Sequence, residues 1–597
     1  MFAGGFELVR SLEQTIESIL PGVQKPSRYI GGESNQVVKD LDSATARVVW
    51  SYPDAYEIGT SNSALQILYS MVNERTEASA ERAFCPWPDM ADAMRRADVP
   101  LFSLESWRPV READMWGMTL QHELCYTNIL EMLDLAGVPL HAADRTQDDP
   151  IVIGGGPCAS NPEPIAPFFD CFLIGEAEDL ILQVIEILER LPDRRKRMLA
   201  LARIPNVYVP ALGAHLVDRA VYDSFDISTQ PTAPIVPYSA AIFNRASVEV
   251  MRGCTRGCRF CHAGSWYRPV RERPADKVIE AGLATLDCTG YDELSLTSLA
   301  TSDYTDIDTA IVGIKEARPG LHLSLPSNRV DTGPIAMSAA ANARQGSITI
   351  APEAATQRMR NIICKTIDDE MIDGAVRAAF EQGYTSLKTY FMIGLPGETH
   401  DEIQAIVDFG ARARAIGIEV LGNETRFTVH VSASNFVPKP HTAFQWEGMA
   451  PREQLLKKQQ YIRRAMKRDR IKLSLHDPKT SMLEGAIGRG GRDIAAVIEH
   501  AWRGGARFDA WNECYKEEAW FEAFAAVADT TLDEQATYQY DEFEPLPWDH
   551  IRSGLSKEFL LDELWQSRAE AVTGDCRWDG CTDCGACLGP IRTRVMK

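Results

Sequence analysis

Three cysteines near the middle of the chain have a spacing that suits metal chemistry. Cys254, Cys258 and Cys261 follow a strand-like run in the segment MRGCTRGCRFCHAG, with the spacing CxxxCxxC. Three thiolates on one short loop can ligate three irons of a cubane cluster and leave the fourth iron open. The same loop contains three glycines that permit a tight backbone around a cluster, namely Gly253, Gly257 and Gly264. The spacing therefore predicts a 4Fe-4S cluster with one open iron.

This loop has two other interpretations. A zinc site would need a fourth ligand, which His262 could supply. Three cysteines can also be small buried residues with no ligand. The position at the end of a strand, with Phe260 before the third cysteine, favours the cluster.

A second group of cysteines lies near the end of the sequence. Cys576, Cys581, Cys584 and Cys587 occur in DCRWDGCTDCGACLGP, with the spacing CxxxxCxxCxxC. Four thiolates this close together complete a metal site without help from elsewhere. We favour a second iron-sulfur cluster, with structural zinc and a redox-active or disordered thiol tail as alternatives. Most of the other cysteines are expected to be buried apolar residues; they are Cys85, Cys125, Cys158, Cys171, Cys288, Cys364 and Cys514.

The elements around these cysteines follow an α/β pattern. Short apolar runs alternate with helical patterns over residues 46–225, which indicates a Rossmann-like domain with a parallel sheet. Residues 226–240 contain three prolines and are predicted to be a linker. Strand and helix patterns alternate again over 241–450, as in a partial (β/α)6 barrel whose functional residues lie at the carboxyl ends of strands. Residues 1–45 are predicted to be a helical segment, and 451–597 a mixed, mainly helical region with a cysteine-rich tail.

A glycine-rich turn follows one strand of the predicted Rossmann-like domain. In DPIVIGGGP, Gly154, Gly155 and Gly156 end an apolar run. A backbone without side chains can lie flat against a large planar or phosphate-bearing ligand at the carboxyl edge of a sheet. Two alternatives remain for this turn. The domain could have lost the ability to bind a cofactor, or the turn could be a docking surface for the substrate.

The cysteine loop resembles the signature of the radical S-adenosylmethionine superfamily. In that superfamily the open iron chelates the cofactor, and an electron from the cluster splits it into methionine and a 5′-deoxyadenosyl radical. The resemblance extends to the strand ends that follow the loop. The residues it implies for binding S-adenosylmethionine are Ser298 or Thr297, Glu353, Arg358, Lys388, Gly394 and Gly397, with Glu398 beside the last glycine.

The glycine turn and the Gly-Glu pair that follows resemble the cobalamin-binding domain that precedes the barrel in many radical enzymes. Gly154, Gly155 and Gly156 are the implied cobalamin contacts. The chain lacks the Asp-x-His-x-x-Gly motif that gives cobalt a histidine ligand. His122 is the nearest candidate, but a lone histidine before a helix is more often structural. The resemblance covers nearly the whole chain and is to a bacterial family whose reaction it does not fix.

The leading functional hypothesis is a radical methyltransferase. It would bind a 4Fe-4S cluster, S-adenosylmethionine and cobalamin, receive electrons from a reductase or flavodoxin-type donor, and methylate an unactivated carbon. The resemblance makes RNA or a translation-related protein a candidate substrate. One alternative keeps the radical without methyl transfer, as in rearrangement or sulfur insertion with the second cluster. A third hypothesis is a non-catalytic iron-sulfur sensing module.

Composition limits the class of protein. Among 597 residues, 45% are apolar and 24% charged, which is typical of folded globular proteins. The formal net charge of −22 argues against a broad nucleic-acid footprint, although 457–472 holds eight basic residues that we interpret as the solvated face of a helix. No apolar run is long enough to cross a membrane, and the start of the sequence lacks a secretory signal. A cytoplasmic protein with reduced thiols is therefore expected.

Overall fold

The computed structural model describes residues 11–228, 230–239, 241–326, 329–330, 346–423, 425–468 and 471–587. The chain forms two compact units, each built from discontinuous stretches. The first contains residues up to Ala220, together with Ala233–Asn244 and Ile498–Ala519; the second contains Val221–Thr232, Arg245–Val497 and the stretch from Trp520. None of the described helices is both long and apolar enough to cross a membrane.

The first unit is a Rossmann-like sheet in the order β2-β1-β3-β4-β5-β6. Its strands are β1 (Arg47–Tyr52), β2 (Ser79–Phe84), β3 (Met115–Thr119), β4 (Ile151–Gly155), β5 (Cys171–Leu173) and β6 (Val207–Tyr208). The first five pair in parallel, and β6 is antiparallel to β5. Strands β1 and β2 are buried along their whole length, as expected for a sheet covered on both faces.

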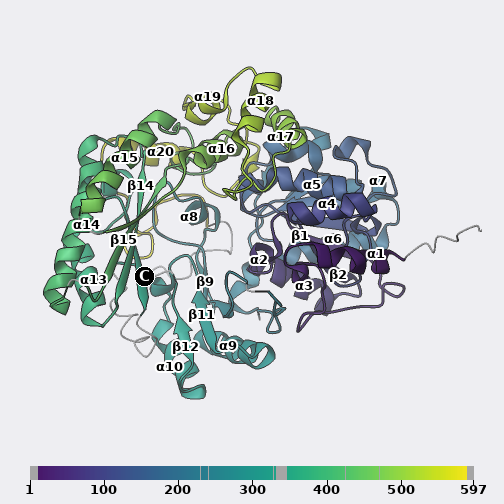
Figure 1. Ribbon diagram of the computed structural model, residues 1–597, viewed down its shortest axis with the longest axis horizontal. Coiled ribbons are helices and arrows are strands. Elements are labelled where there is room, and N and C mark those ends of the chain that lie inside the picture. Colours follow the sequence, from purple (N-terminus) through teal and green to yellow (C-terminus); the bar gives the residue numbers. More distant parts are fainter. Residues whose placement is uncertain are drawn as a thin grey trace, which may run out of the picture. The chain divides into compact units, whose positions relative to one another are not determined.

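Helices cover the sheet of the first unit. Val48 and Trp50 of β1 share a core with α3 (Ser63–Arg75) and α6 (Glu178–Arg190). Helices α4 (Pro88–Ala97) and α5 (Tyr126–Ala136) lie side by side (Figure 1). The remaining long helices of this unit are α1 (Leu12–Ile19) and α7 (Arg194–Leu201). The parallel α/β architecture predicted from the alternating pattern is confirmed.

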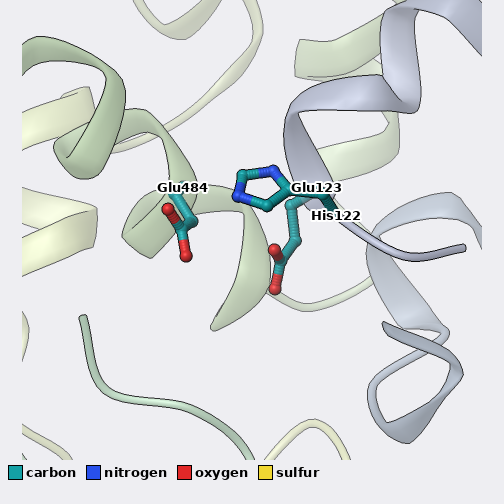
Figure 2. Close-up of side chains that lie close together, drawn as sticks. All are labelled: His122, Glu123 and Glu484. Carbon is teal, nitrogen blue, oxygen red and sulfur yellow. The ribbon is translucent and has the colours of Figure 1, made fainter. Parts of the chain in front are cut away.

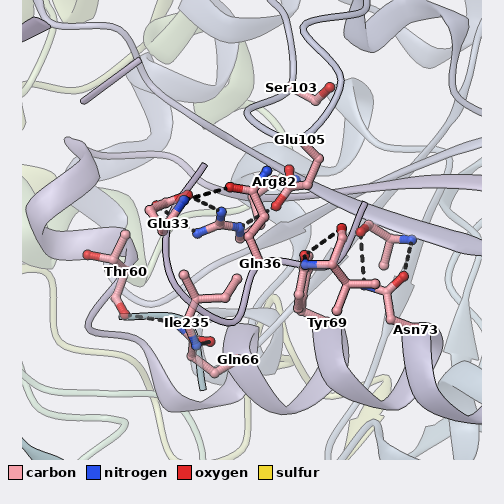
Figure 3. Close-up of polar contacts among 12 residues, drawn as sticks. Glu33, Gln36, Thr60, Gln66, Tyr69, Asn73, Arg82, Ser103, Glu105 and Ile235 are labelled. Carbon is pink, nitrogen blue, oxygen red and sulfur yellow. Dashed lines mark hydrogen bonds and ion pairs between the residues drawn. The ribbon is translucent and has the colours of Figure 1, made fainter. Parts of the chain in front are cut away.

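A buried ion-pair cluster lies beside β2 (Figure 3). Arg82 has no exposed side-chain surface and pairs with Glu33 at 2.7 Å and Glu105 at 2.6 Å. A buried guanidinium is tolerated only when its charge is matched, which these two carboxylates provide. Burial raises the pKa of Glu105 to about 7 although Arg82 opposes the shift.

A segment from late in the sequence belongs to the first unit. Asp509 accepts a hydrogen bond of 2.6 Å from the Thr127 hydroxyl, and the Phe508 amide donates to Asn128 at 2.7 Å. The Trp511 indole donates to Asp54, just after β1, at 2.9 Å. This segment therefore packs at the carboxyl edge of the first sheet, far in sequence from the strands it contacts.

The second unit contains two parallel sheets of an open, partial barrel. The first has the order β12-β11-β8 and the second β13-β14-β15-β16. Their strands are β8 (Ala246–Glu249), β11 (Glu293–Thr297), β12 (His322–Ser324), β13 (Ser347–Glu353), β14 (Ser386–Ile393), β15 (Thr428–Asn435) and β16 (Lys472–Leu475). The short antiparallel pair β9 (Met251–Arg252) and β10 (Arg271–Glu272) flanks the cysteine loop.

Helices connect these strands and cover one face of them. They are α8 (His262–Trp266), α9 (Ala275–Thr289), α10 (Ile307–Ala317), α12 (Gln357–Ile362), α13 (Asp369–Glu381), α14 (His400–Leu421) and α15 (Arg452–Arg468). Phe391 of β14 packs on Phe409 of α14 with ring centroids 5.1 Å apart. Lys388 and Tyr390 alternate with the buried residues of β14 and therefore point to the face away from these helices.

The region after the barrel is mainly helical, as predicted. Its helices are α16 (Pro478–Gly488), α17 (Ile494–Arg503), α18 (Glu517–Val527), α19 (Leu532–Thr537) and α20 (Lys557–Arg568). The predicted solvated basic face is seen on α15, where Lys457 is exposed and pairs with Glu453. Strand β16 continues the barrel beyond the limit at residue 450 that the sequence pattern predicted.

Candidate metal centre and its surroundings

The cysteine loop lies between β9 and α8. Gly253 has a φ of +89°, and a Cβ atom there would lie 2.5 Å from the carbonyl oxygen of Tyr267, so only glycine fits. Cys261 precedes α8, and its Sγ accepts a hydrogen bond of 3.3 Å from the Gly264 amide. The Cys261 amide donates to the Cys258 carbonyl at 3.1 Å. The loop therefore closes on itself around its sulfurs.

The three thiols fit an iron-sulfur cluster. Cys254, Cys258 and Cys261 are each partly buried. Burial raises the pKa of the Cys254 thiol, and that of Cys261 to about 12, and the neighbouring Cys258 raises both further. Thiols whose charges shift one another's pKa lie close together. Bound iron would convert these thiols to thiolates. A Cβ atom on Gly264 would lie only 3.3 Å from the Cys261 sulfur, so glycine keeps space beside it.

Buried arginines hold the loop in place. The Arg259 side chain is fully buried, and its Nε donates to Glu563 of α20 at 2.9 Å. Its Nη1 donates to the carbonyls of Asn361, Ile362 and Ala571 at 2.9–3.1 Å. Sequence reasoning missed this residue, and the only signal was its place between two cysteines of the motif.

A second buried arginine, Arg268, also holds the cysteine loop by hydrogen bonds to its backbone. It donates hydrogen bonds to the carbonyls of Gly264, Thr255 and Arg256 at 3.2, 3.4 and 2.9 Å. These bonds satisfy backbone acceptors in a segment with little regular structure. Arg268 therefore fixes the path of the chain from the first cysteine to the third.

His262, the suggested zinc ligand, packs in an aromatic stack. Its ring stacks on Trp266 with centroids 5.7 Å apart, and Trp266 in turn contacts His441. Burial, together with the charges of His441 and Lys439, lowers the pKa of His262 to about 3. The ring is therefore a neutral part of an aromatic stack.

Glu353 ends β13 beside the cysteine loop. It has a φ of +65°, a conformation that costs a non-glycine residue of the order of 1–3 kcal/mol and clusters at functional sites. Burial raises the pKa of Glu353, and Lys365, 3.8 Å away, lowers it. Lys365 also lowers the pKa of Cys261, so it lies near both groups. Lys365 was not predicted, because nothing in its local sequence distinguishes it.

Ser298 and Thr297 lie at the end of β11 in local hydrogen bonds. The Ser298 hydroxyl accepts from the Ala300 amide at 3.1 Å and donates to Thr301 at 3.3 Å. The Thr297 hydroxyl donates to the Val248 carbonyl at 3.2 Å. These bonds shape the turn after the strand.

The glycine-rich turn after β14 is fixed by a buried carboxylate. Gly394 and Gly397 have φ values of +81° and +73°. The Gly394 amide donates to both oxygens of Glu398 at 3.0 Å, and Glu398 pairs with Lys458 at 2.5 Å. Glu398 is therefore a structural partner that ties the turn to α15.

Arg358 and Lys388 are two further residues that the resemblance implied for the cofactor. Arg358 pairs with Glu402 and Glu570, both at 3.0 Å, and donates to the Gly397 carbonyl at 2.7 Å. Lys388 is the third residue of β14, about 17 Å along the strand from its carboxyl end at ~3.3 Å per residue. The structure brings Glu353, but not Lys388, to the end of the barrel that holds the cysteines.

In the first unit, the glycine turn ends β4 at the carboxyl edge of the sheet. A Cβ atom on Gly154 would lie 2.6 Å from the Phe172 ring, so packing alone explains this glycine. Gly156 has a φ of +105°. Gly155, Gly156 and Cys158 are partly exposed, so their backbone can contact a ligand. The turn therefore fits the predicted cobalamin contact at two of its three glycines.

Other groups at this edge have structural roles. The Nδ1 atom of His122 accepts from the Leu124 amide at 3.2 Å and caps the short helix that begins at Glu123 (Figure 2). The interpretation of His122 as a structural residue agrees with this cap.

The first unit also has a hollow of about 650 Å³ between the carboxyl-terminal ends of α4 and α5. It lies at the amino edge of the sheet, opposite the glycine turn. Arg95 and Asp134 line it and pair at 2.7 Å. Because ligands of such sheets bind at the carboxyl edge, this hollow is not the candidate cofactor site.

Comparisons with known proteins identify the family. The model "Radical SAM proteins, N-terminal" matches residues 64–210, and the model "Radical SAM superfamily" matches 248–410. An uncharacterized protein of Methanocaldococcus jannaschii is 26% identical over 455 residues, which are 75% of this chain and 90% of that protein.

Two solved structures are similar at low identity. One is the radical S-adenosylmethionine methyltransferase TsrM from Kitasatospora setae with cobalamin and a [4Fe-4S] cluster bound, with 16% identity, a TM-score of 0.48, and coverage of 68% of this chain and 76% of that one. The other is the cobalamin-dependent S-adenosylmethionine radical enzyme OxsB, with 14% identity, a TM-score of 0.48, and coverage of 88% and 79%. Because the two family models match most of both α/β regions, the chain belongs to the radical S-adenosylmethionine superfamily.

Proposed function

We propose that this radical S-adenosylmethionine enzyme methylates an unactivated carbon of an RNA substrate with the help of cobalamin. One observation carries the radical chemistry: Lys365 lies 3.8 Å from Glu353 and also near Cys261. It therefore brings Glu353 close to the three partly buried cysteines. The methyl-transfer part rests on the partly exposed glycine turn at the carboxyl edge of the first sheet.

The cofactors would supply a 5′-deoxyadenosyl radical and a methyl group when bound, and the chain positions them. Cys254, Cys258 and Cys261 would hold the cluster. Lys365 favours the ionised form of Glu353, which could then accept hydrogen bonds from the ribose hydroxyls or the amino group of S-adenosylmethionine. Electrons would come from a reductase or flavodoxin-type donor of the cytoplasm.

A row of basic side chains supports an anionic substrate. Lys388, His430 and Lys472 are direct neighbours across three parallel strands and share one face of the sheet. Burial lowers the pKa of His430, and the charges of Lys388 and Lys472 lower it further. A phosphate placed here would relieve the repulsion between these groups. This row lies away from the end of the barrel that holds the cysteines, and it is the observation that supports RNA as the substrate.

Cofactor cleavage is tested with anaerobically reconstituted protein, dithionite and S-adenosylmethionine. We expect 5′-deoxyadenosine from the wild type and from a Cys288→Ala control, whose thiol is exposed on α9, but none from Cys258→Ala. Activity retained in Cys258→Ala would disprove the ligand assignment. The absence of product from the wild type would favour a non-catalytic sensing module. Protein expressed with ample vitamin should show a cobalamin absorption band, and its absence would remove methyl transfer.

The substrate is tested by feeding isotope-labelled methionine to cells with and without the protein. We expect a labelled methyl group on a carbon of RNA only when the protein is present; a label on protein instead would contradict the RNA assignment. In vitro, Lys472→Ala should reduce the salt dependence of RNA binding by about one phosphate contact. It should leave the 5′-deoxyadenosine formed without substrate unchanged.

Radical chemistry without methyl transfer is the second candidate, and the tail cysteines favour it. A cluster held by the four tail thiols, close to the loop of the first metal centre, would supply one of its sulfides for insertion into a substrate. Mass spectrometry of the product distinguishes the two, since sulfur insertion and methylation add different masses.

A further inference from the structure

The four C-terminal cysteines come together around one small cavity of about 20 Å³. The residues lining it are Cys254, Thr255, Arg268, Cys576, Cys581, Thr582, Cys584, Ala586 and Cys587. Four of them are the tail cysteines. Three others are Cys254 and Thr255 of the first cysteine loop and Arg268, which donates hydrogen bonds to that loop. The tail thiols therefore form a single site beside that loop.

Specific contacts hold the tail in this position. Arg577 donates to the Thr305 hydroxyl at 2.8 Å, and Arg256 of the cysteine loop pairs with Asp575 at 2.9 Å. The Cys584 carbonyl accepts from the Ser556 amide at 3.0 Å. These contacts come before and within the cysteine run, so the chain itself arranges the sulfurs.

The backbone between the cysteines is also specialised. Gly580 and Gly585 have φ values of +95° and +90°, next to Cys581 and Cys584. A Cβ atom on Gly585 would lie 2.9 Å from the Gly554 carbonyl oxygen. Glycine at these positions lets the chain turn sharply enough for all four sulfurs to face one cavity.

The pattern of ligands favours an iron-sulfur cluster over zinc. The tail combines the spacings C-x4-C-x2-C and C-x2-C-x2-C, both of which occur in ferredoxins. Ligand sulfurs of a tetrahedral zinc site lie about 3.8 Å apart, given Zn–S bonds of ~2.3 Å. Among the described residues, no three cysteine sulfurs lie within 4.8 Å of one another.

We propose that Cys576, Cys581, Cys584 and Cys587 bind a second 4Fe-4S cluster directly beside the first. All four corners would have protein ligands, so this cluster would not bind S-adenosylmethionine. Arg268, which lines the cavity and clasps the first loop, would place a positive charge between two anionic clusters. The site is independent of methyl transfer and stands whether or not cobalamin binds.

The test is the iron, sulfide and zinc content of full-length protein after anaerobic reconstitution. We expect about eight irons and eight sulfides per wild-type chain, and about four of each in the tail variant Cys581→Ser/Cys584→Ser and in the loop variant Cys258→Ala/Cys261→Ala. The exposed Cys288→Ala is the matched control and should keep all eight.

Electron paramagnetic resonance of the reduced proteins provides a second measurement. The wild type should show the broadened signal of two interacting clusters, and each variant the signal of one. Zinc in place of iron at the tail, or unchanged iron in the tail variant, would overturn the proposal. The single variant Cys581→Ser guards against misfolding, since it should keep the circular dichroism of the wild type while losing the interaction. Loss of cofactor cleavage with eight irons retained would count against the proposed function alone.

Discussion

Removal of the Arg259 side chain should release the cysteine loop. Arg259 is fully buried, and its partner Glu563 is only 8% exposed. Arg259→Met would leave that carboxylate buried without its cation and three backbone carbonyls without their donor. Breaking a buried pair from one side costs about 3–5 kcal/mol. At ~2–4 °C per kcal/mol for a large domain, the melting temperature should fall by roughly 6–20 °C.

Thermal unfolding and iron content together test this prediction. We expect Arg259→Met to melt earlier and to retain less iron, because its side chain fixes the second and third cysteines. Arg377→Ala is the matched control, since Arg377 forms an exposed pair with Glu419 and exposed pairs contribute little to stability. The double variant Arg259→Met/Glu563→Gln should recover part of the loss. If Arg259→Met melted like Arg377→Ala with full iron, the loop would not depend on this anchor.

Two further predictions concern packing and pH. Gly253→Ala should abolish iron binding because its Cβ atom would collide with the Tyr267 backbone. Gly290→Ala is the control and should bind iron normally, since a Cβ atom there has no neighbouring atom within 4 Å. Equal iron content in the two variants would refute the clash. Glu105 has a folded pKa of about 7, above its value near 4.5 when unfolded, so its contribution to stability is full below pH 4.5 and is lost as pH rises through 7. Glu105→Gln should therefore gain about 3 kcal/mol relative to the wild type between pH 4.5 and 8, and a constant difference in melting temperature would contradict this.

Much of the fold could be predicted, and the cysteine motifs recognised, because their signals are local. Cysteine spacing needs only one loop, and alternation of strands and helices repeats over short distances, so both could be recognised in the sequence. The same holds for the helical region after the barrel and for the interpretation of His122 as a structural residue. Among the single cysteines, Cys85, Cys125, Cys171 and Cys364 are buried as expected, whereas Cys288 is exposed.

The features that escaped prediction depend on contacts between distant segments. The role of Lys365 depends on its position near Glu353 and the cysteine loop. The role of Arg259 depends on its ion pair with Glu563 of α20. Trp511 reaches Asp54 across more than four hundred residues of sequence. The place of Lys388 near the start of β14 follows from the register of the sheet, which a motif match does not reveal.

The most direct test of the account is whether S-adenosylmethionine binds the open iron of the first cluster. The measurement is electron-nuclear double resonance of the reduced tail variant Cys581→Ser/Cys584→Ser, which leaves only that cluster, with S-adenosylmethionine labelled with ¹⁵N or ¹⁷O in its methionine part. The account predicts hyperfine coupling from the labelled amino and carboxylate groups. A cluster that forms but shows no coupling, with protein ligands on all four irons, would contradict it.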